Sequence, residues 1–65
     1  MTHEELRWAR LNLGLTQEQM AKMLETDTRT LRKYEGGYRQ IAVRIARLMD
    51  AYAAGYRPKD WPTGN

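Results

Sequence analysis

The stretch "LTQEQMAKMLETDTRTLRKYEGG", residues 15–37, contains two short amphipathic runs that are separated by a three-residue gap and followed by two glycines. Thr16 and Asp27 are good N-caps, so the pattern predicts helices over 17–24 and 28–34. Helices this short are not stable alone in water. They therefore require a platform that the rest of the chain supplies.

The flanking segments predict that platform. Thr2 and Glu5 have the spacing of a capping box, which predicts a helix over 3–13 that stops at Gly14. After the double glycine, apolar periodicity predicts a fourth helix over 41–54 that stops at Gly55. The expected fold is all-α, with one domain over residues 1–55 and a tail over 56–65.

The tail, "YRPKDWPTGN", has two prolines, two aromatic residues and no periodicity, which favours an extended segment. Two alternatives are open for it. Tyr56 and Trp61 fold back onto the domain, or the tail stays disordered.

Composition limits the function classes. A chain of 65 residues allows one domain with a small core. The absence of cysteine excludes disulfides and thiolate metal sites, and His3 alone predicts neither a metal site nor a catalytic base. The sequence also has no serine and no glycine-rich phosphate loop, which argues against an enzyme, a cofactor or a small-molecule substrate. No apolar run is long enough to cross a membrane, so a soluble cytoplasmic protein is expected.

The charge distribution points to a polyanion. The net charge is +3, yet residues 29–47 alone hold six basic side chains and one acidic one. A wheel of the helix predicted over 28–34 places four polar or basic residues within an arc of about 140° and its apolar residues opposite. A helix about 10–12 Å across with such a face matches the roughly 12 Å major groove of DNA. The alternative is a basic face that water simply solvates.

Residues from Leu6 to Tyr52 resemble the helix-turn-helix domain of Cro-like and lambda-type phage repressors, also called the xenobiotic-response-element family. The resemblance is carried by Leu6 and Arg10, "GLTQEQMA" (14–21), Leu24, "TRTLRKYEGG" (28–37) and "IAVRIARLM" (41–49). It implies a compact lambda-repressor-like domain of four helices, or five if the tail adds one.

The resemblance also implies roles for individual residues. Gln17 matches a position that approaches a DNA phosphate, and Arg10 and Glu35 match a partly buried ion pair, the alternative being two separately solvated charges. The positions that contact base edges are matched by Thr28, Arg29, Arg32 and Lys33.

Three further residues are expected at DNA phosphates because of where they lie in the chain. Tyr38 and Arg39 follow the double glycine, although an ordinary polar loop is the alternative for both. Arg44 lies on the first turn of the fourth predicted helix, from which only the DNA backbone is within reach.

One residue departs from the family pattern. Glu25 stands where the family usually has glycine, at a turn position that tends to be left-handed. A non-glycine residue in that conformation costs on the order of 1 kcal/mol.

The fourth predicted helix has more apolar surface than one small core needs. We therefore expect a homodimer whose interface combines a flat edge of this helix with aromatic residues of the tail. The expected interface residues are Ala42, Ala46, Met49, Ala53, Tyr56 and Trp61.

These features predict a sequence-specific regulator of transcription that binds double-stranded DNA. We expect a repressor or autoregulator, from a phage or mobile element, that binds a palindromic operator as a homodimer. One alternative is an antitoxin-type regulator whose tail is gripped by a protein partner. Another is a protein-interaction module that has lost DNA binding.

Overall fold

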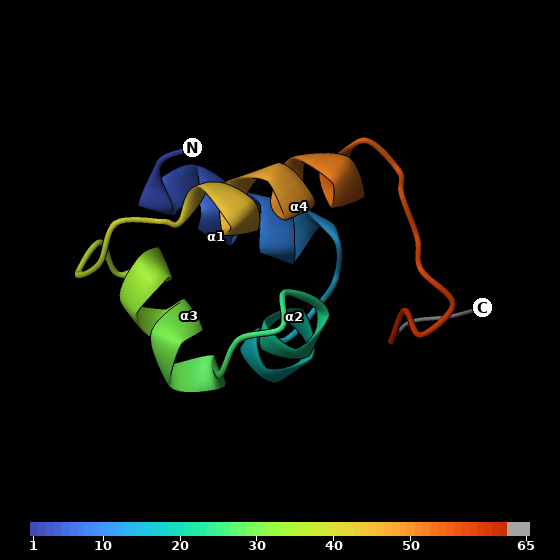
Figure 1. The fold of residues 1–65 in the computed structure, drawn as a ribbon, viewed down its shortest axis with the longest axis horizontal. Helices are drawn as coiled ribbons and strands as arrows, with labels where there is room; N and C mark the ends of the chain where they lie inside the picture. The colour runs from blue at the N-terminus through green and yellow to red at the C-terminus, as the bar shows by residue number, and fades with distance from the viewer. Residues whose placement is uncertain (63–65) are drawn as a thin grey trace.

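Four helices form the protein in the computed structural model, which describes residues 1–62 (Figure 1). They are α1 (His3–Asn12), α2 (Gln17–Met23), α3 (Thr28–Glu35) and α4 (Val43–Ala53). The all-α prediction is confirmed, and residues 1–62 contain neither a strand nor a fifth helix. The last part of the predicted tail, residues 63–65, lies outside the described residues.

The helices form two layers. Figure 1 shows α1 and α4 together along one side of the molecule and α2 and α3 on the other. The two short helices pack on each other, and α1 contacts both α3 and α4. This is the expected arrangement of a platform that supports the short helix pair. Within the described residues, no helix combines the length and the apolar character that crossing a bilayer requires.

Side chains cap the N-termini of the first three helices as the sequence predicts. The Thr2 hydroxyl accepts a hydrogen bond from the Glu5 backbone at 3.1 Å, and the Glu5 carboxylate accepts one from the Thr2 backbone at 2.7 Å. Thr16 and Gln19 form the same reciprocal capping box on α2. At α3 the Asp27 carboxylate accepts from the Thr30 backbone at 2.6 Å. These local contacts determine where each helix begins.

Each of the four helices is followed, two residues after its last helical residue, by a residue with positive φ. Gly14, Gly37 and Gly55 occupy three of these positions, and Glu25, with φ of 56°, occupies the fourth. After α2 the Thr26 N–H donates to the Ala21 carbonyl at 2.9 Å, and the Glu25 N–H donates to the Lys22 carbonyl at 3.2 Å. This pair of bonds defines a Schellman motif. The left-handed conformation expected at Glu25 is confirmed.

Replacing Glu25 with glycine is expected to raise the free energy of unfolding by up to about 1 kcal/mol, because glycine adopts positive φ without strain. The larger entropy of glycine in the unfolded chain offsets part of this gain. Urea unfolding measures it. Gly14→Ala is the matched control, since a Cβ at Gly14 meets nothing within 4 Å and only backbone strain opposes it. A loss of stability in Glu25→Gly would instead show that the carboxylate makes a favourable interaction with Arg44 and Arg47, which line the same shallow surface.

The start of α4 differs from the prediction. Ile41 and Ala42 lie outside the helix, and Ala42, the N-cap residue, has extended backbone angles and no side-chain cap. Ile41 still packs against the core, so its apolar character imitated a helical repeat. No residue between Gly37 and Val43 has a side chain that caps well, which left the boundary without a local signal.

The core gathers side chains from every helix and from the tail. Leu6, Met20, Leu24, Leu31, Ile45 and Met49 are fully buried. Tyr52 is also buried, and its hydroxyl donates to the Met23 carbonyl at 2.9 Å. Burial raises the pKa of the Tyr52 hydroxyl, which keeps it protonated as a donor. This bond ties α4 to the end of α2.

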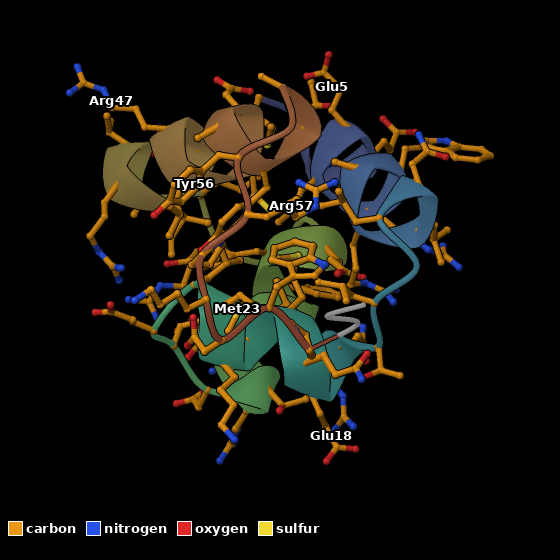
Figure 2. The ribbon with its side chains drawn as sticks, turned by 90° about the vertical axis from the view of Figure 1, so that its right-hand side faces the viewer. Glu5, Glu18, Met23, Arg47, Tyr56 and Arg57 are labelled. Atoms are coloured by element: carbon orange, nitrogen blue, oxygen red, sulfur yellow. The ribbon has the colours of Figure 1, made fainter. Side chains whose placement is uncertain are left out.

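The described part of the tail folds back onto the helices, and Trp61 joins the core. Figure 2 shows the tail, which includes Tyr56 and Arg57, crossing the face of the molecule where Met23 lies. The Trp61 ring packs edge-on against Tyr52 at 5.0 Å, and the Arg57 guanidinium lies 4.5 Å from the Trp61 ring centre. Arg57 also donates to the Tyr52 carbonyl at 2.7 Å. The domain boundary predicted after Gly55 stays a prediction, but the folded-back alternative holds for these residues.

Candidate nucleic-acid interface

Helix α3 buries one side and exposes the other. Leu31, Tyr34 and Glu35 are buried, whereas Arg29, Arg32 and Lys33 are exposed. Thr28, at the first position of the helix, is half-buried. The sequence therefore predicted the outer face of α3 correctly, and three positive charges gather on a helix of eight residues.

An acidic cap begins this helix. The Thr30 backbone N–H that donates to Asp27 lowers the pKa of the Asp27 carboxyl, so the cap is ionised at neutral pH. A negative group at a helix N-terminus also interacts favourably with the helix dipole. Asp27 thus stabilises α3 at the cost of one negative charge near its basic face.

A buried ion pair joins α1 to the end of α3. Arg10 Nε lies 2.7 Å from Glu35 Oε2, and Arg10 Nη2 donates to Glu35 Oε1 at 3.1 Å. Arg10 Nη1 donates to the Leu15 carbonyl at 3.0 Å. Both side chains are close to fully buried, so the pair expected from the family resemblance is formed. It attaches α3 to the platform while the outer face stays free.

Gln17, expected at a DNA phosphate, makes two contacts inside the protein. Its Nε2 donates to Glu35 Oε1 at 3.2 Å, and its Oε1 accepts from Arg32 Nε at 3.2 Å. Gln17 therefore joins the buried ion pair to an exposed arginine of α3. The phosphate contact stays a prediction. Sequence reasoning missed this bridge, because Gln17 lies 15 and 18 residues away from its two partners in the chain.

The loop after α3 presents the other predicted phosphate contacts. Tyr38 is 87% exposed, which leaves its hydroxyl free for a ligand. The Arg39 guanidinium lies over the Tyr34 ring, 5.8 Å from its centre. Tyr34, on the buried side of α3, thereby orients Arg39 beside the C-terminal end of that helix.

Arg44 has a structural contact in addition to any role on DNA. Its Nη1 donates to the Leu24 carbonyl at 3.0 Å. Carbonyls at the C-terminal end of a helix have no hydrogen-bond donor within the helix, and Arg44 supplies one for α2. The first turn of α4 is thus connected to the gap between α2 and α3. Nothing in the sequence pattern indicated this bond.

The expectation that Met49 and Trp61 form part of a dimer interface is wrong. Met49 is fully buried and Trp61 is 8% exposed, because α4 turns one side of its apolar arc into the core and the tail covers another part. Ala46 is half-buried. The exposed members of the expected interface are Ala42, Ala53 and Tyr56, and Tyr56 stacks on Tyr52 at 5.9 Å.

The comparisons with known proteins agree with this geometry. A helix-turn-helix family model matches residues 6–52. The chain therefore belongs to the helix-turn-helix family of lambda-repressor and Cro-like proteins, a family of DNA-binding regulators. Neither the curated proteins nor the solved structures contained a match.

Proposed function

We propose that this DNA-binding protein is a sequence-specific repressor or autoregulator that places α3 in the major groove of its operator. The observation that carries the proposal is the outer face of α3, where Arg29, Arg32 and Lys33 are exposed together while the opposite face is anchored. The residues proposed to face DNA from this helix are Thr28, Arg29, Arg32 and Lys33.

The remaining contacts in this proposal are with the DNA backbone. In helix-turn-helix proteins the first helix of the pair crosses the backbone while the second reads bases. Gln17 begins α2, and Tyr38 and Arg39 lie just beyond the C-terminal end of α3. Gln17 hydrogen-bonds Arg32 and Glu35, so all three positions lie toward the C-terminal half of the reading helix, which suits contacts with the phosphates beside it. We propose that Arg44, on the first turn of α4, adds one more.

We further propose that the protein binds a palindromic operator as a homodimer, which matches a two-fold protein to a two-fold site. Ala42, Ala53 and Tyr56 supply exposed small and aromatic surface for the contact. A protein partner, as in an antitoxin, is the second candidate. It is favoured by Trp8 and Leu11, which are 65% and 47% exposed next to each other on α1.

Selection of bound duplexes from a random pool tests the proposal, and the winners are expected to contain inverted repeats. Arg29→Ala should then lose preference at particular operator positions, by about 1–3 kcal/mol if the arginine contacts a guanine. Arg39→Ala should weaken operator and scrambled duplex alike and make the salt dependence shallower by about 0.9 in log–log slope. Arg7→Ala removes the same charge from the outer face of α1 and serves as the control.

Two outcomes would contradict the proposal. If no duplex is enriched, the protein does not recognise a DNA sequence, and the result favours the alternative of a protein-interaction module. If Arg29→Ala weakens operator and scrambled duplex equally, α3 is not the element that reads bases.

A further inference from the structure

Arg32 differs from the other two basic residues of α3 in its position. At 100° per residue, Arg29 and Lys33 lie opposite the buried side chains, whereas Arg32 lies on the flank between them and Glu35. That flank faces the first turn of α2, since Arg32 Nε donates to Gln17 Oε1 at 3.2 Å. Arg32 therefore points away from the centre of the outer face.

The buried ion pair determines how Gln17 is oriented. Both Glu35 oxygens accept hydrogen bonds from Arg10, so the Gln17 amide must turn its NH₂ group toward Glu35 Oε1. The amide oxygen then points the other way, toward Arg32, which only donates. Each bond in the series from Arg10 to Arg32 thus has one possible direction, and the flip of the Gln17 amide follows from the chemistry of its two neighbours.

We propose that Gln17 is a positioning residue that keeps Arg32 beside α2, so that Arg32 contacts the DNA backbone at the edge of the major groove while Arg29 and Lys33 contact bases. This inference rests on the proposed function and differs from the expectation that Arg32 contacts a base edge. In a helix-turn-helix complex the first helix of the pair lies across the backbone. A guanidinium bound beside the first residue of α2 is therefore next to a phosphate.

The remaining donors of Arg32 suit that contact. Only Nε is engaged by Gln17, and within residues 1–62 neither Nη1 nor Nη2 has a recorded hydrogen bond. Two parallel N–H groups match two phosphate oxygens. An arginine that is already positioned also loses less rotamer freedom when DNA binds. The function of the Gln17 contact would then be to place Arg32 before binding.

The test compares Arg32→Ala, Gln17→Met and the double variant with the unmodified protein, on operator and scrambled duplex across salt. Arg32→Ala should weaken both duplexes by the same factor, on the order of tenfold, and make the log–log salt slope shallower by about 0.9. Gln17→Met is close in size and removes both hydrogen bonds. It should weaken both duplexes a few-fold, and in its presence Arg32→Ala should cost clearly less.

A measurement without DNA checks the positioning directly. In a ¹⁵N–¹H spectrum, the Nε–H signal of Arg32 should shift in Gln17→Met and stay unchanged in Arg7→Ala, which leaves the ion pair and Gln17 intact. Gln17→Asn, whose amide is one carbon shorter, should behave like Gln17→Met. Circular dichroism establishes that each variant is folded.

The outcomes separate this inference from the proposed function. If the unmodified protein enriches no duplex, the proposed function and the inference both fail. If it selects an operator but Arg32→Ala changes the base preferred at one position, only the inference is overturned, because Arg32 then reads a base. Equal effects of Arg32→Ala with and without Gln17, or an unmoved Arg32 signal in Gln17→Met, would overturn it as well.

Discussion

Replacing Trp61 with alanine is expected to lower the free energy of unfolding by about 3–5 kcal/mol, the usual cost of deleting a buried tryptophan side chain. Trp61 is 8% exposed and packs against Tyr52 and Arg57. At the usual stability per residue, a domain of this length is stable by only roughly 3–10 kcal/mol. The substitution should therefore remove a large share of that stability, although residue 61 lies outside every helix.

Urea and thermal unfolding followed by circular dichroism measure this effect. Tyr56→Ala is the control within the tail, because Tyr56 is 56% exposed and only stacks on Tyr52, and it should cost about 1 kcal/mol. Fluorescence gives a second reading: in Trp8→Phe, Trp61 is the one remaining tryptophan, and its emission should be that of a buried indole until the domain unfolds. Unchanged stability of Trp61→Ala would show that the tail is not part of the core in solution.

Arg10→Met is expected to destabilise the protein by about 3–5 kcal/mol, because it leaves the buried Glu35 carboxylate without its partner. Arg10 is also the donor to the Leu15 carbonyl, so a second buried group loses its hydrogen bond. The double change Arg10→Met with Glu35→Leu removes both charges. It should recover much of the loss, although the Leu15 carbonyl and the Gln17 NH₂ group then lack their partners.

A double-mutant cycle that includes Glu35→Leu alone measures the coupling between the two residues by urea unfolding. Arg7→Met, on the outer face of the same helix, is the matched control and should change stability by less than about 0.5 kcal/mol. Additive losses across the cycle would overturn this prediction. They would mean that Arg10 and Glu35 stabilise the protein independently, despite the 2.7 Å contact between them.

The basic face of α3 could be predicted from the sequence, whereas the individual roles of its residues could not. Arg29, Arg32 and Lys33 are exposed because Leu31 and Tyr34 occupy the opposite side of a regular helix, and periodicity alone determines that. The contact of Arg32 with Gln17 depends on how α2 and α3 cross. Crossing geometry is a property of packed side chains, so it has no local signature.

The sequence by itself determined the local structure of this protein. Capping residues mark the starts of α1, α2 and α3, and residues with positive φ mark the ends of all four helices. These signals act over three to six residues, where backbone geometry and hydrogen bonding leave few alternatives. The left-handed Glu25 and the four-helix fold followed from such signals together with the family resemblance.

Only the tertiary structure decided which apolar side chains are buried in the core and which polar side chains form hydrogen bonds within the protein. Met49 and Trp61 have the character of interface residues but are buried within the domain, and Gln17 has the character of a ligand contact but is bound to Glu35 and Arg32. Burial and hydrogen bonding are collective, because a side chain is buried only when others far along the chain cover it. Residue type therefore predicted what each of these side chains can do, and packing between distant elements selected what it does.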